Sequence, residues 1–186
     1  MTRVTRRRNW KLSAAEGELE RQSVTPPFQN EGMCEICEGA SDDEVLFGIY
    51  GRILRFGWTI EYVQGPTVRE SWGYTIGLTE RFGHPELAIA GRCPEHTARV
   101  INAIGREIGL GRVIPPGGVI RCGDEDYRLV HVHLRHYELG TFGMWDFYYR
   151  SLGRRPADHC VLEIALPGER GVFVDEPDDR WGDGDG

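Results

Sequence analysis

The stretch from residue 72 to residue 91 constrains the fold of this 186-residue chain more than any other. Its two ends, residues 72–78 and 86–90, are rich in aromatic, aliphatic and β-branched side chains, which is typical of buried strands. The Gly83-His84-Pro85 segment predicts a short connection between them, because glycine and proline favour turns. Strands joined by so few residues usually pair with each other in antiparallel fashion. The stretch therefore predicts two neighbouring strands of a mostly antiparallel sheet.

Two other segments carry the signals of amphipathic helices. In the first, Ser41-Asp-Asp-Glu44 has the form of a capping box, apolar residues follow at helical spacing, and Gly57 ends the pattern. Residues 58–63 then alternate apolar and polar side chains, which predicts a half-buried strand. The second helix begins at Pro94, since proline lacks only an N–H that is unpaired at the first helical position, and it ends at Gly109.

The C-terminal half predicts a strand over residues 126–137, a short aromatic-rich helix over residues 141–152 and a further strand over residues 160–166. Alternation along the first of these strands separates two sets of side chains onto opposite faces, namely Val130, Val132 and Leu134 on one face and His131 and His133 on the other. We therefore expect one α+β domain over residues 31–174, with a mostly antiparallel sheet and two main helices packed on it.

Net charge is concentrated at the ends of the chain. Residues 1–30 lack helical or strand periodicity and contain an arginine cluster, and residues 175–186 are acidic and glycine-rich, so we expect a disordered basic arm and a frayed tail. Acidic and basic residues nearly balance over residues 45–174, so the formal net charge of −7 belongs to the appendages. A balanced body lacks the basic face that nucleic-acid binding requires. Contact with RNA or DNA is expected only through Arg3, Arg6, Arg7, Arg8 and Lys11 of the arm.

The location of the protein is predicted from segments that the sequence lacks. No apolar run of signal-peptide length follows the arginines, and no stretch approaches the ~20 apolar residues of a membrane span. We therefore expect a soluble, cytoplasmic protein. Cysteines in that compartment are usually reduced rather than paired in disulfides.

Two pairs of residues have the spacing of metal ligands. Cys34-x-x-Cys37 and Cys93-x-x-His96 would each contribute two ligands to one tetrahedral zinc. Cys37 lies just before the first helix and Cys93 at the start of the second, and helix N-termini favour the thiolate, the species that binds metal. The four residues predict a structural zinc site. Other interpretations are a metal held by Cys34 and Cys37 with different partners, a redox dithiol, or cysteines that act as small apolar side chains.

Four polar residues are candidates for acid–base chemistry. His84 and Glu86 bring an imidazole and a carboxyl group beside the central strands, and His131 and His133 would share one strand face. The structural alternative is that Glu86 caps the Gly-His-Pro turn and that the two histidines lie on the solvent side of the sheet. No Gly-x-Ser-x-Gly elbow or His-Glu-x-x-His helix accompanies them.

The aromatic residues of the same strands are either core or cleft. Trp72 and Tyr74 have the strand propensity of buried sheet residues, and they would line a binding cleft if their face of the sheet were open. The candidate cleft as a whole comprises Trp72, Tyr74, His84, Glu86, His131 and His133.

Several short motifs in this chain occur together in one known family. They are Cys34-x-x-Cys37 ahead of a helix, Gly57-Trp58 at its end, Tyr74-Thr-Ile-Gly-Leu78, Gly83-His-Pro-Glu-Leu87 and Gly91. With them the chain resembles, from about residue 34 to residue 174, the bacterial family called domain of unknown function 4262. That family has no settled activity, so the resemblance implies a fold and no particular function.

The end of the domain departs from the family pattern. Where the family tends to have Gln, then Trp-Pro-Asp and later Pro-Trp, this chain has Glu163, then Leu166-Pro-Gly168 and Val174-Asp175. A family role that rests on those C-terminal positions does not transfer directly to this chain.

These features predict an uncharacterised binding or accessory module with a structural zinc site. One alternative is a small, hydrolase-like enzyme that uses His84 and Glu86 or the His131/His133 face, with these groups converging in one pocket. The other is a nucleic-acid-associated or ribosome-associated protein tethered by its basic arm, whose binding would fall steeply with salt.

Overall fold

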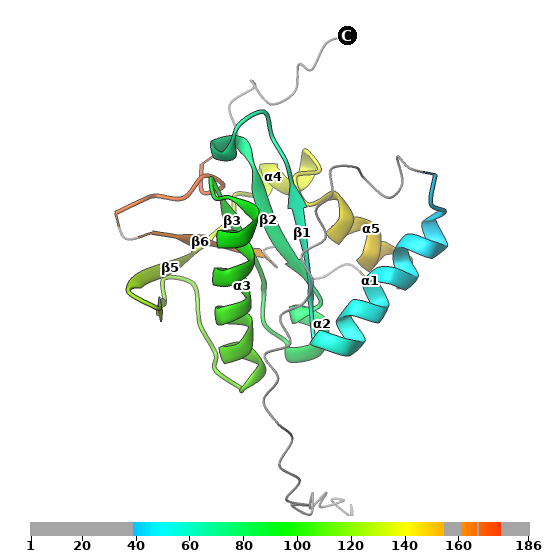
Figure 1. The fold of residues 1–186 in the computed structure, drawn as a ribbon, viewed down its shortest axis with the longest axis horizontal. Coiled ribbons are helices and arrows are strands. Elements are labelled where there is room, and N and C mark those ends of the chain that lie inside the picture. Colours follow the sequence, from blue (N-terminus) through cyan, green and yellow to red (C-terminus); the bar gives the residue numbers. More distant parts are fainter. Residues whose placement is uncertain (1–38, 155–160, 167, 176–186) are drawn as a thin grey trace, which may run out of the picture.

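A computed structural model describes residues 39–154, 161–166 and 168–175 of the chain (Figure 1). Within these residues the strands form a six-stranded sheet in the order β1-β2-β3-β6-β5-β4. Neighbouring strands are antiparallel except for β3 and β6, which run parallel. The strands are β1 (Thr59–Val63), β2 (Trp72–Ile76), β3 (Glu86–Ala90), β4 (Val119–Cys122), β5 (Glu125–His131) and β6 (Val161–Ala165).

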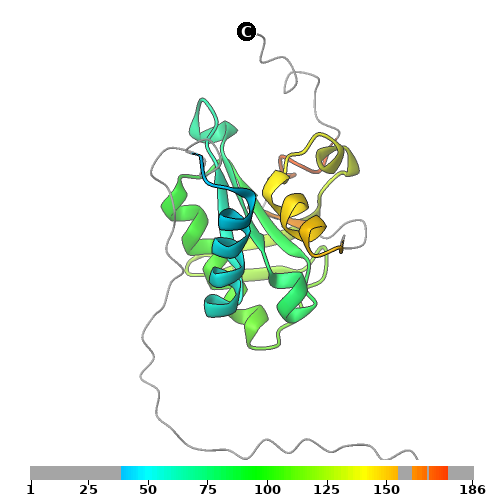
Figure 2. The same ribbon diagram turned by 90° about the vertical axis from the view of Figure 1, so that its right-hand side faces the viewer.

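Helices cover both faces of this sheet (Figure 2). The helices are α1 (Asp42–Phe56), η1 (Val68–Glu70, a 3-10 turn), α2 (Leu78–Phe82), α3 (Pro94–Gly109), α4 (Leu134–Glu138) and α5 (Gly143–Ser151). The long helix α3 packs on one face, where its isoleucines meet β3, β5 and β6. Helices α1 and α5 pack on the opposite face against β2 and β3. The predicted α+β class with a mostly antiparallel sheet is confirmed, and the two main helices, α1 and α3, lie on opposite faces.

The capping box predicted for α1 is present. The Glu44 backbone amide donates to the Ser41 hydroxyl (3.4 Å), and the Ser41 amide donates to the Glu44 carboxylate (2.9 Å), so exposed N–H groups of the first turn are paired. Helix α1 ends at Gly57, whose φ of 91° lies in the left-handed region that glycine adopts without strain. A Cβ at that position would also lie 2.9 Å from the Phe82 ring.

The core under α3 depends on close approach of helix and sheet. Gly105 faces Trp58, and a Cβ there would lie 2.7 Å from the indole ring. The Trp58 indole N–H donates to Asn102 Oδ1 at 3.1 Å, which pairs a polar atom that the close packing buries. As predicted, α3 begins at Pro94.

Several short elements were missed by the sequence analysis. The connection between β2 and β3 contains α2, flanked by left-handed Gly77 (φ 116°) and Gly83 (φ 65°), where a plain turn was predicted. The predicted strand over residues 72–78 therefore ends at Ile76. Strand β4 was also missed. Elements of four or five residues are too short to establish a clear hydrophobic period.

The predicted strand over residues 126–137 is too long. Strand β5 ends at His131, and His133 is the N-cap of α4, where its Nδ1 accepts from the Arg135 backbone amide (3.2 Å). The His133 amide donates to the Phe173 carbonyl (2.7 Å) instead of continuing the sheet ladder. The prediction of a strand face shared by His131 and His133 is therefore wrong.

The strand face predicted to carry Val130, Val132 and Leu134 is not the face that packs against α3. Tyr127 and Leu129 are the β5 residues buried in the core beneath α3. Val132 packs in the other core, with α1 and α5, and Leu134 is exposed at the start of α4. Both faces of β5 carry apolar residues, so alternation alone did not identify which face packs on α3.

The predicted ends of the chain were not tested. The basic arm over residues 1–30 and residues 176–186 of the acidic tail lie outside the described residues. In the described ranges, no helix has both the length and the apolar character needed to cross a membrane.

Candidate ligand-binding site

A pocket of about 770 Å³ opens at one end of the sheet. Its walls include residues of β2 and η1, of the segment from α4 to the start of α5, and of residues 172–175. Most of its lining side chains are apolar or aromatic. Small-molecule sites in proteins usually have volumes of about 300–1,000 Å³ and this kind of lining.

Trp72 and Tyr74 of β2 contribute to the pocket, and both also fasten β2 to the chain that leads into α5. The Tyr74 ring is buried, and its hydroxyl accepts from the Met144 backbone amide at 3.2 Å. Burial raises the pKa of Tyr74 well above its ordinary value, so the phenol stays neutral. The Trp72 indole N–H donates to the Thr141 carbonyl at 3.1 Å. These bonds hold this part of the pocket in a defined shape.

The segment carrying Phe173 forms an adjoining wall. The Phe173 ring is buried, and it packs edge-on against Trp72 (centroids 6.2 Å apart) and against His136 (5.1 Å). Such edge-to-face contacts are favoured arrangements of aromatic rings. The wall therefore consists of interlocking rings contributed by segments distant in sequence.

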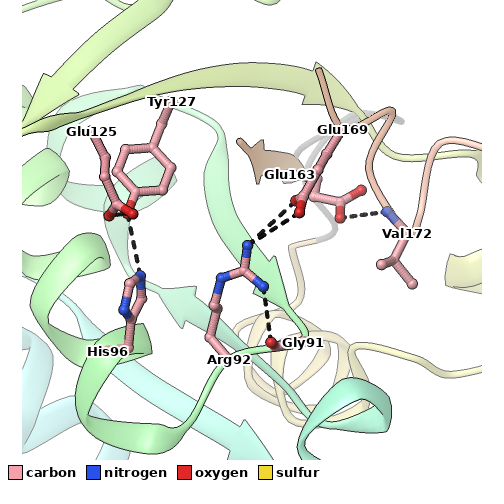
Figure 3. A network of polar contacts seen from close by, with 8 residues as sticks. All are labelled: Gly91, Arg92, His96, Glu125, Tyr127, Glu163, Glu169 and Val172. Atoms are coloured by element: carbon pink, nitrogen blue, oxygen red, sulfur yellow. Dashed lines mark hydrogen bonds and ion pairs between the residues drawn. The ribbon is translucent and has the colours of Figure 1, made fainter. Parts of the chain in front are cut away.

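Glu163 of β6 binds the backbone of this wall. Its Oε1 accepts from the Val172 amide at 2.6 Å (Figure 3), and its Oε2 accepts from the Phe173 amide at 2.8 Å. The side chain is buried, and burial raises the pKa of Glu163 although both amide bonds oppose that shift. A Cβ on Gly171 would lie 2.5 Å from Glu163 Oε2, so this position has no room for a side chain. We call the contact between Glu163 and the Val172 and Phe173 amides the Glu163 latch.

His136 is the imidazole of the pocket. It belongs to α4, is 6% exposed, and places its Nε2 3.1 Å from the Asp175 carbonyl oxygen. A carbonyl oxygen only accepts, so Nε2 carries the hydrogen and donates it. Burial lowers the pKa of His136, which favours the neutral ring. In the neutral ring Nδ1 is then an acceptor, and within the described residues no group pairs with it.

The charged groups at the rim differ in how they are paired. Asp175 forms an ion pair with Arg170 (3.3 Å), and Glu70 accepts from the Thr67 hydroxyl (2.5 Å). Arg69 is exposed at the rim, and among the described residues it has no ion-pair or hydrogen-bond partner. The rim therefore offers an uncommitted positive charge beside an apolar interior.

The other predicted cleft residues lie outside the pocket. His131 and His133 are exposed and do not line it. His84 is buried under the loop before β4, with Nδ1 2.7 Å from the Pro85 carbonyl and Nε2 3.2 Å from the Ile114 carbonyl. These contacts tie the Gly-His-Pro turn to that loop. His84 is therefore not positioned to act on a ligand in the pocket.

Glu86 is fully buried and lies where β3 meets α2. Its carboxylate oxygens accept from the hydroxyls of Thr75 and Tyr149 and from the backbone amides of Gly77, Leu78 and Thr79, at 2.6–3.2 Å. Every one of these groups donates, so the carboxylate caps the start of α2 and joins it to α5. Glu86 and His84 do not converge in the pocket, and their contacts are with the protein itself.

The predicted zinc ligands are only partly described. Cys34 and Cys37 lie outside the described residues, and Cys93 is an exposed free thiol at the N-cap of α3. In the described part of the chain, no group of three or more His, Cys, Asp or Glu residues has the arrangement of a metal site. The zinc site therefore stays a prediction.

His96, the fourth predicted ligand, has partners at both ring nitrogens. An Arg99 N–H donates to its Nδ1 (3.2 Å), so its Nε2 carries the hydrogen and donates to the Tyr127 hydroxyl (3.2 Å). The Tyr127 hydroxyl in turn donates to Glu125 (Figure 3). Zinc binding by His96 would require one of these bonds to break.

The residues that sequence reasoning missed are those that enter the pocket from separate segments. His136 belongs to the same His-rich stretch as His131 and His133, and only the unexpected turn at His133 brings it inside. Phe173 and Asp175 reach the pocket because Glu163 fixes the segment before them. The presence of Glu163 at a strand position between apolar residues was the one local signal, since a buried carboxyl group requires a partner.

Comparison with known proteins identifies the family of the chain. No curated protein and no solved structure matches it. The family model described as Domain of unknown function (DUF4262) matches residues 52–179, a range that begins after Cys34 and Cys37 and includes every pocket residue. The chain belongs to the family of domain of unknown function 4262.

Proposed function

We propose that this protein is a binding module whose small-molecule ligand occupies the pocket between β2 and residues 172–175. The observation that carries the proposal is a pocket of about 770 Å³ with aromatic walls that are already fastened in place. Preformed walls reduce the ordering cost that binding would otherwise incur. The accessory role predicted from the sequence then consists in capturing a small molecule.

Binding is favoured over catalysis by the contacts of the predicted catalytic residues. Glu86 and His84 hold α2 and the loop before β4, and His131 and His133 lie away from the pocket. An enzyme of the proposed hydrolase-like kind needs an acid or base within reach of its substrate. Nucleic-acid attachment through the basic arm concerns residues outside the described ranges, and it stays a separate prediction.

A pocket-filling substitution tests the proposal. Gly143 lines the pocket at the start of α5, and a Cβ added there meets no atom within 4 Å, so Gly143→Phe fills the space without removing a core contact. Gly51 of α1 is exposed, is equally unobstructed and lies outside the pocket, so Gly51→Phe is the matched control. We expect bicyclic aromatic acids such as naphthalene-2-sulfonate to bind the wild type and Gly51→Phe in ligand-observed NMR, and to lose binding to Gly143→Phe. Absence of binding to the wild type, or equal binding to both variants, would overturn the proposal.

A structural zinc remains a second proposal, supported by one observation. Cys93 is an exposed thiol at the N-cap of a 16-residue helix, and its side chain makes no capping hydrogen bond there. Metal analysis of untagged protein purified without chelator is expected to give one zinc per chain, lost in Cys34→Ser and in Cys93→Ser. Metal-free protein with readily titrated thiols would refute it, and zinc that survives Cys93→Ser would place the other ligands elsewhere.

A further inference from the structure

Resting on the proposed binding function, we infer that the ligand is an anionic, planar ring compound that carries an N–H or O–H donor. In this arrangement His136 Nδ1 accepts from the donor, and the Arg69 guanidinium pairs with the anionic group. The inference specifies the chemical class of the ligand and the two residues that recognise it.

The donor requirement follows from the direction of one hydrogen bond. The Asp175 carbonyl can only accept, so it fixes the hydrogen of His136 on Nε2 and leaves a lone pair on Nδ1. His136 is almost fully buried and lines the pocket, and in the described residues Nδ1 has no partner. A ligand donor in the pocket would pair with this free acceptor. A ligand that offers only an acceptor would place its own lone pair against that of Nδ1, and the two would repel each other.

The ring requirement follows from the walls. Trp72, Phe173 and Tyr74 surround the interior, and the rings already present meet one another edge-on. A flat ring system would bury its apolar faces here and add edge-to-face contacts. Aliphatic chains of the same volume would gain the burial without those contacts.

The charge requirement follows from the rim. The nearby carboxylates are engaged, Asp175 with Arg170 and Glu70 with the Thr67 hydroxyl. Arg69 has no such partner in the described part of the chain, and a guanidinium binds carboxylates and sulfonates through parallel N–H donors. A hydroxyl is neutral, so Glu70 keeps its charge, and Arg69 is the group of the rim with which a ligand anion would pair.

A set of matched probes separates these requirements. 6-Hydroxynaphthalene-2-sulfonate has the ring, the anion and the donor, 6-methoxynaphthalene-2-sulfonate lacks the donor, and 2-naphthol lacks the anion. We expect the hydroxy sulfonate to bind the wild type about threefold to tenfold more tightly than the methyl ether, since this is the range for one hydrogen bond. We expect 2-naphthol to bind more weakly than the hydroxy sulfonate.

Substitution at His136 assigns the donor effect to Nδ1. In His136→Gln the side-chain amide nitrogen takes the place of Nε2, so it keeps a donor for the Asp175 carbonyl and leaves no acceptor at the position of Nδ1. This variant is expected to bind both sulfonates with the affinity that the wild type shows for the methyl ether. Arg69→Gln is expected to keep the preference for the hydroxyl group and to lose the preference for the sulfonate over 2-naphthol.

The outcomes distinguish the inference from the proposed function. Equal binding of the hydroxy and methoxy sulfonates by the wild type would overturn the donor assignment, and equal binding of 2-naphthol and the hydroxy sulfonate would overturn the anion assignment. Either result leaves the pocket as a binding site. If none of the probes binds wild-type protein that is folded, the inference and the proposed function fail together. If His136→Gln unfolds, retention of the hydroxyl preference in His136→Phe, whose ring has no acceptor at the position of Nδ1, would refute the role of Nδ1.

Discussion

Two buried glutamates on neighbouring parallel strands obtain their hydrogen-bond donors from different parts of the fold. Glu86 of β3 and Glu163 of β6 are both at most 2% exposed, and Glu163 pairs in register with Ala88, two residues after Glu86. The Glu86 carboxylate accepts from hydroxyls and from the first amides of α2. The Glu163 carboxylate accepts from the Val172 and Phe173 amides, and burial raises its pKa.

The difference separates a buried carboxyl group that joins elements of the core from one that holds a wall of the pocket. Glu86 connects β2, α2, β3 and α5, so its loss affects the core of the domain. Glu163 connects one strand to a segment without regular secondary structure, and that segment carries the pocket wall. We therefore expect substitutions of Glu86 to change global stability and substitutions of Glu163 to change mainly the wall.

The largest effect is expected for Glu86→Ala. The substitution leaves the Gly77, Leu78 and Thr79 amides without an acceptor in the interior, and breaking a buried charged network costs about 3–5 kcal/mol. Urea unfolding followed by circular dichroism measures this free energy. Asp126→Ala, at an exposed position of β5, is the control and is expected to change stability by about 0.5 kcal/mol or less. A loss of less than about 1 kcal/mol in Glu86→Ala would contradict the assigned role of Glu86.

A smaller and more local effect is expected for Glu163→Gln. The amide nitrogen of glutamine would face a backbone N–H, so one of the two amides of the Glu163 latch loses its acceptor, at a cost of about 1–3 kcal/mol. Hydrogen exchange should accelerate at the Val172 and Phe173 amides while the Leu87 amide in β3 stays protected. Glu169→Gln, at a side chain 56% exposed, is the matched control. Equal acceleration at all three amides would show that Glu163 supports the whole domain.

The parts of the fold that the sequence predicted depend on local chemistry. The capping box at Ser41 and Glu44, the left-handed Gly57 and the proline at the start of α3 act within a few residues, so their patterns are visible in the chain. The end of β5 was not predicted, because it depends on the Phe173 carbonyl, which accepts from the His133 amide forty residues earlier in the chain. Long-range bonds of this kind leave no periodic pattern.

The pocket was predicted only through Trp72 and Tyr74. Their aromatic character marked a sheet face, and the face became a pocket because α4 and residues 172–175 pack around its end. Glu86 was selected for its charge and is instead a structural cap, which its position next to the Gly-His-Pro turn had also suggested. His136 was overlooked, because its tautomer and burial depend on Asp175, a contact between distant segments.

The smallest effect expected is a pH dependence that belongs to Glu163. Since burial raises its folded pKa above the ordinary value of 4.5, the folded protein binds a proton at a higher pH than the unfolded chain does. The contribution of Glu163 to the free energy of unfolding therefore increases as the pH falls through the folded pKa. It becomes constant below about 4.5, where the unfolded chain is protonated as well. Glu163→Gln has no proton to bind, while the other groups titrate alike in both proteins.

The difference in unfolding free energy between the wild type and Glu163→Gln, measured by urea titration at a series of pH values from neutral downward, isolates this contribution. It is expected to shift in favour of the wild type as the pH falls. A difference that shifts toward the variant would mean that the bonds from the Val172 and Phe173 amides outweigh burial and that the folded pKa lies below the ordinary value. In that case the bonds from protein donors would dominate at Glu163, as they do in the contacts of Glu86, and the contrast between the two sites would disappear.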